Sequence, residues 1–281
     1  MTFRLLLAAL TCISIVQSQE PTFRGGVEKV RVDVLVTLNG NPVTTLTPAD
    51  FEILDNGVRQ RIDENVAFED APLNLVMAVD ASSSVTGNRA ELLRGACHQV
   101  LNQLKAGDQA GLVVFGDAVI VRSRIADIAS VKAAVDRPFP PGQTALVDAS
   151  QASILLADSE PGRALILVFS DGLEVSSYLT ASDVVETVKR SDAILYGVVL
   201  RGMTRPRFLG ELAEASGGEL FEIASPADIA PTFQRVLREF RHRYVLTYTP
   251  NGIARSGWHT VKVGVKRQGT TVKARPGYFR H

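Results

Sequence analysis

Apolar and polar residues alternate near the start of the chain. Apolar side chains occupy the even positions from Val30 to Leu38, and polar side chains fill most positions between them. A period of two predicts a strand with one solvent-exposed face. Turn residues follow at 39–42, and Asn56-Gly57 is typical of a hairpin because both residues tolerate positive φ. Residues 27 to about 68 therefore predict a small antiparallel β unit.

From residue 73 the pattern changes to short runs that are apolar at nearly every position. These runs cover residues 73–79, 111–115, 164–169 and 193–200. Segments with helical spacing lie among them, roughly at 88–104, 127–135, 145–157, 181–190, 205–215 and 226–241. Strands buried on both faces that alternate with helices are typical of an α/β domain with a doubly wound, mostly parallel, Rossmann-like sheet.

After residue 240 the apolar period returns to two. The alternating positions are 244, 246 and 248, then 261, 263 and 265, with turn residues at 251–252 and 268–269. Each end of the chain has too few strands to be stable alone in water. We therefore predict that residues 19–70 and 243–281 pair into one small antiparallel β-sandwich, with an α/β domain over 71–242 inserted between them.

The first 18 residues have the features of an export signal. Arg4 is followed by an apolar run over 5–16 and by small residues up to Ser18, which predicts a signal peptide over 1–18. That run is too short to span a bilayer of ~30 Å stably, and no later stretch of about 18 uncharged apolar residues exists. The prediction is an exported protein, periplasmic or secreted, without a stable membrane span.

Composition and charge narrow the function classes. The chain has 281 residues, with 30 Lys plus Arg against 30 Asp plus Glu, and 46% are hydrophobic. A balanced charge with high apolar content argues against a disordered chain and against a nucleic-acid partner. Removal of the signal peptide takes Cys12 away and leaves Cys97 alone, so no internal disulfide is expected. Helical apolar spacing around Cys97 predicts a buried small side chain.

Carboxylate and hydroxyl side chains follow two of the buried runs and open one helix. The segments are 80–84 (Asp-Ala-Ser-Ser-Ser), 142–148 (Gly-Gln-Thr-Ala-Leu-Val-Asp) and 170–172 (Ser-Asp-Gly). In an open α/β sheet, ligands bind beyond the carboxyl ends of the strands, so the three segments are expected to converge there. Oxygen donors suit Mg²⁺, Mn²⁺ or Ca²⁺ better than Zn²⁺ or copper. Neutral hydroxyls compensate a cation's charge only in part, which predicts contact with a carboxylate on a partner.

These three segments resemble the metal-ion-dependent adhesion site of the von Willebrand factor type A family. The resemblance implies that Ser82, Ser84 and Thr144 touch the metal directly, and that Asp80 and Asp171 hold it largely through water. Two positions depart from the usual pattern, since Gln143 stands where glycine is common and Glu174 where a second aspartate is common. The flanking segments 50–57 and 275–279 resemble, more narrowly, the acidobacterial VWFA-related secreted proteins.

Plainer roles exist for each candidate side chain. Ser82 and Ser84 are also typical of turns and helix caps, Thr144 of a helix cap, and Asp80 and Asp171 of solvated loops. Asp148 is expected to favour the dipole of the helix that it opens, and Asp117 to belong to a turn. The joint pattern favours a metal site with these ligands, listed as Asp80, Ser82, Ser84, Thr144 and Asp171.

No catalytic residues are predicted. The sequence lacks a G-x-S-x-G elbow, a P-loop, a G-x-G-x-x-G loop and an H-E-x-x-H helix. The predicted function is a non-enzymatic, divalent-metal-dependent adhesion module that binds a protein or cell-surface ligand presenting a carboxylate. Two alternatives stay open: a metal-assisted phosphoester hydrolase, because oxygen-ligated metals also serve hydrolases, and a structural module whose metal site is unoccupied.

Overall fold

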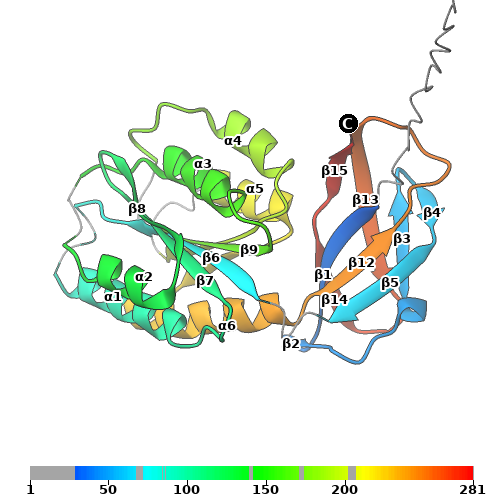
Figure 1. Cartoon of the computed structure of the whole chain (residues 1–281), viewed down its shortest axis with the longest axis horizontal. Helices are drawn as coiled ribbons and strands as arrows, with labels where there is room; N and C mark the ends of the chain where they lie inside the picture. Colours follow the sequence, from blue (N-terminus) through cyan, green and yellow to red (C-terminus); the bar gives the residue numbers. More distant parts are fainter. Residues whose placement is uncertain are drawn as a thin grey trace, which may run out of the picture.

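Two units lie side by side in the computed structural model, an α/β unit and a unit of antiparallel strands (Figure 1). The structure describes residues 29–67, 72–83, 85, 87–138, 142–170, 174–201 and 207–280, without the side chains of 64–67. The predicted signal peptide and Cys12 lie outside the described residues. In the described part of the chain, no helix is both long enough and apolar enough to cross a membrane.

The α/β unit is built on one six-stranded sheet in the order β11-β10-β9-β6-β7-β8. Its strands are β6 (Leu73–Asp80), β7 (Gln109–Phe115), β8 (Val119–Ala126), β9 (Arg163–Ser170), β10 (Ile194–Leu200) and β11 (Leu220–Ile223). All neighbours run parallel except β7 and β8. Every residue of β6, β9 and β10 is buried, as the runs of apolar residues predict. The mostly parallel sheet is thus confirmed.

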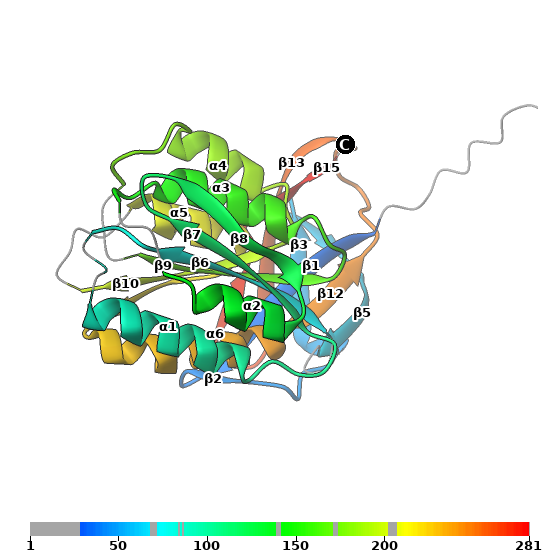
Figure 2. The same ribbon diagram turned by 60° about the vertical axis from the view of Figure 1, so that its left-hand side comes forward.

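Helices cover both faces of this sheet, as Figure 2 shows. One face packs on α1 (Asn88–Leu101), α2 (Ile128–Val135) and α6 (Ile229–Arg241). The other packs on α3 (Leu146–Ala157), α4 (Ala181–Val188) and α5 (Arg207–Ser216). The helical spacing predicts each helix to within a few residues. Asp127 and Thr180 cap α2 and α4 by accepting N–H bonds from Ser130 and Asp183.

The second unit combines strands from both ends of the chain. The N-terminal strands are β1 (Val30–Leu38), β2 (Asn41–Pro42), β3 (Phe51–Asp55), β4 (Val58–Gln60) and β5 (Ile62–Ala67). The C-terminal strands are β12 (Tyr244–Tyr248), β13 (Gly257–Val265), β14 (Thr270–Ala274) and β15 (Gly277–Arg280). They form two antiparallel sheets, β14-β1-β12-β5 with β2 beside β1, and β15-β13-β3-β4. Each sheet contains strands from both chain ends.

One apolar cluster lies between these two sheets. Its members include every second residue of β1 and residues of two C-terminal strands, namely Val30, Val32, Val34, Val36, Tyr244, Tyr248 and Val261. This cluster gives the terminal strands the shared core that neither end could build alone. The hairpin prediction at Asn56-Gly57 is also confirmed, because both residues have positive φ, 47° and 81°.

Cys97 is buried on α1, within the core beneath the sheet. Burial raises the pKa of its thiol to about 12, so almost no thiolate forms at mildly alkaline pH. We predict that a Cys12→Ser variant does not react with Ellman's reagent while native and releases one equivalent of thiolate product in denaturant. Rapid reaction of the native protein would contradict the burial of this side chain.

Candidate metal site

Asp80 ends β6, and the loops around it meet at the carboxyl edge of the sheet. The carboxylate is fully buried; Oδ1 accepts the N–H of Ser82 at 2.8 Å and Oδ2 accepts the hydroxyl of Ser170 at 2.7 Å. Ser170 ends β9, which lies directly beside β6 in parallel. Because parallel neighbours end at the same edge, two residues 90 positions apart share one hydrogen bond.

The segment that contains Thr144 joins the same edge through backbone contacts. The N–H of Ser83 donates to the carbonyl of Gly142 at 2.9 Å, and the Ser83 hydroxyl donates to that carbonyl at 3.2 Å. The N–H of Gln143 donates to Oδ1 of Asp117 at 2.6 Å. Ser82 and Thr144 are each 4% exposed. The structure therefore brings the loop after β6 next to the segment before α3.

Thr144 and Ser82 are also typical of helix caps and turns, and the structure tests both of these roles. The N-cap residue of α3 is Ala145 and that of α1 is Gly87, and neither N-cap residue caps its own helix with a side chain. Thr144 therefore does not cap α3, although Ser82 does lie in a turn, with its carbonyl accepting the N–H of Val85 at 2.8 Å. The Thr144 carbonyl instead accepts the N–H groups of Val175 and Ser176, at 3.0 and 3.3 Å.

Glu174 caps α3 from a neighbouring loop. Its carboxylate accepts the N–H groups of Val147, Ser176 and Ser177 at 2.8, 3.0 and 2.7 Å. The first turn of a helix has N–H groups without intrahelical partners, and a carboxylate there also interacts favourably with the helix dipole. Glu174 thus holds the segment 174–177 against the start of α3, beside Thr144. One signal of this role is visible in the sequence, an acidic residue with two serines at the second and third positions after it.

Asp148 and Asp117 hold loops as well. Asp148 lies in the first turn of α3, as predicted, but its oxygens accept the N–H groups of Tyr178 and Leu179 at 3.0 and 2.9 Å. Its main contact is therefore with a loop and not with its own helix. Asp117 lies between β7 and β8 and contacts Gln143. Both carboxylates fix the backbone around Thr144.

Of the five predicted ligands, the structure places Asp80, Ser82 and Thr144. Ser84 and Asp171 lie outside the described residues. Among the residues that are described, no group of three or more His, Cys, Asp or Glu is suited to a metal. One buried carboxylate with serine and threonine hydroxyls is a donor set that fits a hard divalent cation.

Comparison with known proteins identifies the family. A family model, the von Willebrand factor type A domain, matches residues 74–235. This chain belongs to the von Willebrand factor type A family. The matched residues span the sheet and helices of the α/β unit and contain all three segments of the candidate site. No curated protein matches the chain.

Solved structures of this family share the fold at low sequence identity. A von Willebrand factor type A protein from Catenulispora acidiphila is 13% identical with a TM-score of 0.55, over 91% of this chain and 75% of that one. Mussel byssus proximal thread matrix protein 1, with a zinc-occupied MIDAS motif, is 16% identical with a TM-score of 0.54. That alignment covers 66% of this chain and 49% of the mussel protein. The D319A mutant of the PilB minor pilin from Streptococcus sanguinis is 13% identical with a TM-score of 0.51, over 62% of each chain. This chain therefore covers less than two thirds of the mussel and pilin proteins.

Proposed function

We propose that this chain is an exported, non-enzymatic adhesion module that binds a divalent cation and, through it, a carboxylate of a protein or cell-surface partner. The observation that carries the proposal is the convergence of the loop after β6, the end of β9 and the segment before α3 around the buried Asp80. Mg²⁺ is the expected cation, with Mn²⁺ or Ca²⁺ as alternatives.

The ligand set explains why a partner would supply an acid. Asp80, Ser82, Ser84, Thr144 and Asp171 provide two carboxylates and three neutral hydroxyls. If the carboxylates act through water, as the family resemblance implies, a divalent cation keeps part of its positive charge. An external carboxylate is the group that compensates this charge best, because carboxylates are the hard anionic ligands of proteins.

Adhesion is favoured over catalysis by the named relatives and by the residues near the site. A minor pilin and a byssus thread protein share the fold, and the latter's structure contains a metal in its MIDAS motif. The described carboxylates beside the candidate site, Glu174, Asp148 and Asp117, accept backbone N–H bonds and so serve to position loops. A metal-assisted hydrolase would need a group positioned to activate water, and a structural module would leave the site unoccupied.

The organisation of the whole chain forms part of the proposal. We infer a signal peptide over 1–18, and an α/β domain over 71–242 inserted in a β-sandwich built from 19–70 and 243–281. The pairing of β1 with both β12 and β14, and of β3 with β13, supports the single β-sandwich. The narrower resemblance to acidobacterial secreted proteins stays a prediction.

Calorimetric titration with Mg²⁺ and Mn²⁺ tests the metal site. We expect the wild-type chain to bind one cation, Asp80→Ala to lose measurable binding, and Thr144→Ala to bind about 10- to 100-fold more weakly, in the range seen when groups around a metal are removed. Asp136→Ala and Thr249→Ala are matched controls, since both side chains are exposed and make their contacts elsewhere, Asp136 with His98 and Thr249 with Asp63.

Two outcomes would decide against the proposal. Equal cation affinity in the wild type, Asp80→Ala and Thr144→Ala would remove the metal site. Metal-dependent turnover of phosphoesters by the wild type that Asp80→Ala abolishes would favour the hydrolase. Circular dichroism of each variant shows whether a lost affinity reflects a lost fold.

A further inference from the structure

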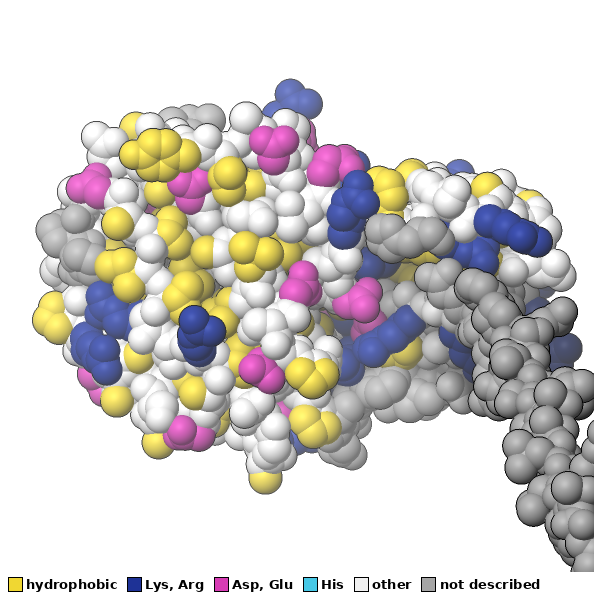
Figure 3. All heavy atoms as spheres, turned by 45° about the horizontal axis from the view of Figure 1, so that its top comes forward, with side chains coloured by type: hydrophobic (Ala, Val, Ile, Leu, Met, Phe, Trp, Pro, Cys, Tyr) yellow, Lys and Arg dark blue, Asp and Glu magenta, His cyan; other side chains and the backbone are white. Residues whose placement is uncertain are grey.

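A cleft of about 230 Å³ opens where the α/β unit meets the β unit. Lys29, Arg31 and Arg275 of the β unit line it, with Lys189 and Arg190 from the end of α4. These last two precede β10, whereas Asp80 ends the parallel strand β6, so the cleft and the candidate metal site lie at opposite ends of the sheet. Figure 3 shows Lys and Arg side chains beside carboxylates along this boundary.

Two cations of the cleft have close polar partners, since Lys189 lies 2.5 Å from Glu186 and Arg275 donates to the Ser191 carbonyl, but the other ion pairs there are longer. Lys29 lies 3.7 Å from Asp63, Arg31 lies 3.3 Å from Asp33, and Arg275 lies 3.4 Å from Asp192. Asp192 is the one carboxylate among the described residues that line the cleft, and its side chain is 88% exposed. An ion pair as long and as exposed as that of Lys29 with Asp63 contributes little, so Lys29 retains much of its positive field, whereas the Arg275 side chain is only 10% exposed.

Arg190 is the lining residue best arranged to receive an anion. Its guanidinium lies 3.9 Å from the ring centre of Phe279, and no carboxylate of the described residues pairs with it. Stacking on an aromatic ring fixes the plane of a guanidinium while its N–H groups stay directed outward. Such a planar set of donors matches the oxygens of phosphate, sulfate or carboxylate.

Arg243 adds positive charge behind the cleft. It is fully buried, donates to the Tyr196 hydroxyl at 2.9 Å and to the Gly217 carbonyl at 2.5 Å, and its Nε has no partner among the described residues. A buried guanidinium without a carboxylate partner raises the local potential. Burial lowers the pKa of nearby Arg275, and Arg243 lowers it further against the opposite effects of Asp192, Asp33 and Asp158.

Counting the described charges that line the cleft or interact with its lining gives the same sign. Seven cationic side chains, Lys29, Arg31, Arg163, Lys189, Arg190, Arg243 and Arg275, face five carboxylates, Asp33, Asp63, Asp158, Glu186 and Asp192. The whole chain is balanced, with 30 charges of each sign, so this excess is local. A local excess in a small cleft points to a compact anion and not to a nucleic acid.

We propose that this cleft binds a multivalent oxyanion, phosphate or sulfate, either free or as a group carried on a polymer. An anion held there contacts Lys29 and Arg275 of one unit and Lys189 and Arg190 of the other. It therefore stabilises the contact between the two units. The site is independent of the candidate metal site, because none of its residues belongs to the loops around Asp80.

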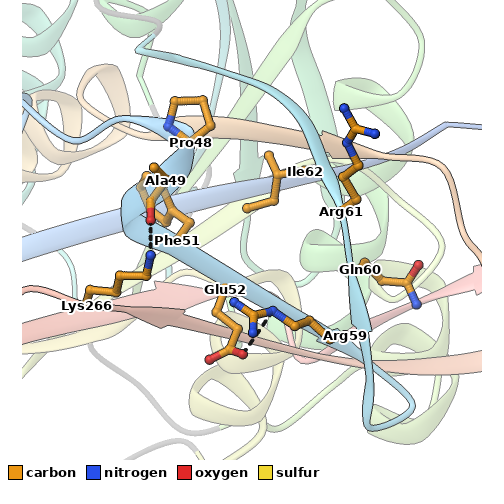
Figure 4. Close-up of a pocket in the computed structure, with 9 residues that line it drawn as sticks. All are labelled: Pro48, Ala49, Phe51, Glu52, Arg59, Gln60, Arg61, Ile62 and Lys266. Carbon is orange, nitrogen blue, oxygen red and sulfur yellow. Dashed lines mark hydrogen bonds and ion pairs between the residues drawn. The ribbon is translucent and has the colours of Figure 1, made fainter.

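A second basic groove supplies the control. This groove, of about 540 Å³, lies in the β unit between η1 (Pro48–Asp50) and strands β3 to β5 (Figure 4). Its Arg59 pairs with Glu52 at 3.3 Å, and its Lys266 donates to the carbonyl of Ala49 at 2.5 Å, as the dashed lines in Figure 4 show. Arg59→Gln thus removes one exposed arginine of the β unit that does not line the cleft between the two units.

The test is calorimetric titration of the full chain with inorganic phosphate and with inorganic sulfate, at constant ionic strength balanced by chloride. We expect saturable binding to the wild type, about tenfold weaker binding to Arg190→Gln, in line with the loss of one charge-assisted hydrogen bond, and unchanged binding to Arg59→Gln. Thermal unfolding in the same solutions should show a rise in the unfolding midpoint that is smaller for Arg190→Gln.

Sulfate and phosphate also stabilise proteins by exclusion from the surface, which raises the midpoint of every variant alike. An equal rise in the wild type, Arg190→Gln and Arg59→Gln, with no heat of binding, would overturn the proposal. A parallel titration with inorganic polyphosphate distinguishes the source of the anion. Binding of both probes indicates a free anion, binding of polyphosphate alone indicates a group on a polymer, and binding of neither overturns the site.

Discussion

Replacing Asp55 by alanine is expected to lower the free energy of unfolding of the β unit by at least about 3 kcal/mol, because three side chains lose a hydrogen-bond partner at about 1–3 kcal/mol each. Asp55 ends β3 and is fully buried. Its Oδ2 accepts the hydroxyls of Tyr248 and Tyr278 at 2.7 and 2.9 Å, and Nδ1 of His259 lies 3.0 Å from Oδ1. Because Tyr248 belongs to one sheet and Asp55 to the other, this carboxylate joins the two sheets.

The size of the effect follows from the groups that would be left behind. Burial raises the pKa of Tyr248 and Tyr278, and the hydrogen bond to Asp55 raises each further, so both hydroxyls remain protonated donors. Without Asp55, the hydroxyls of Tyr248 and Tyr278 lose their acceptor, and the fully buried imidazole of His259 loses its partner. Nε2 of His259 is already buried without a partner among the described residues, so this ring has little alternative hydrogen bonding.

Urea unfolding followed by tryptophan fluorescence measures this loss. The chain has one tryptophan, Trp258 of β13, so its emission reports on the β unit. Tyr278→Phe is the matched control, since it removes one donor and leaves the carboxylate with Tyr248 and His259; about 1 kcal/mol is expected for this change. If both variants unfolded at the same urea concentration, Asp55 would not be the centre of the network.

The sequence predicts the buried parts of the fold better than its edges. Strands β6, β9 and β10 are recognisable because helices cover both of their faces, which requires an unbroken apolar run. The edge strands β8 and β11 were missed. Strand β8 is partly exposed along its length and mixes apolar with basic residues, and β11 has only four residues, so neither shows a clear period. Their pairing is determined by their neighbours in the sheet.

For the candidate site too, the sequence predicts some features and not others. Motif spacing indicates Asp80, Ser82 and Thr144, because each follows a buried strand or precedes a helix. The roles of Ser170, Glu174 and Asp148 depend on which distant N–H or carboxylate group faces each side chain, and a single sequence does not contain that information. The cleft between the two units could not be predicted from the sequence for the same reason. Arg190 and Arg275 line one cleft only after the strands from both chain ends have paired into the β unit.

Gly142→Ala is expected to weaken cation binding at least about tenfold, although it changes no proposed ligand. Removal of a group that supports the metal ligands has an effect of this size on metal affinity. A Cβ on Gly142 would lie 2.3 Å from the backbone nitrogen of Asp117 and 2.8 Å from its Cγ. No real contact is that short, so the backbone must separate here. The Gly142 carbonyl accepts both hydrogen bonds from Ser83, and Gly142 is the first residue of the segment that contains Thr144.

This substitution tests whether cation binding needs the segment before α3 to lie close to its neighbours, because it leaves every proposed ligand in place. Forcing an added methyl into a packed contact costs typically about 1–3 kcal/mol, which circular dichroism during thermal unfolding would detect. Gly95→Ala is the matched control: it lies inside α1 with no atom within 4 Å of the added Cβ, and is expected to stabilise the helix by about 0.5–1 kcal/mol with unchanged cation affinity. Wild-type Mg²⁺ affinity in a folded Gly142→Ala variant would show that the segment before α3 is not part of the site, and Thr144 would then lose its proposed role.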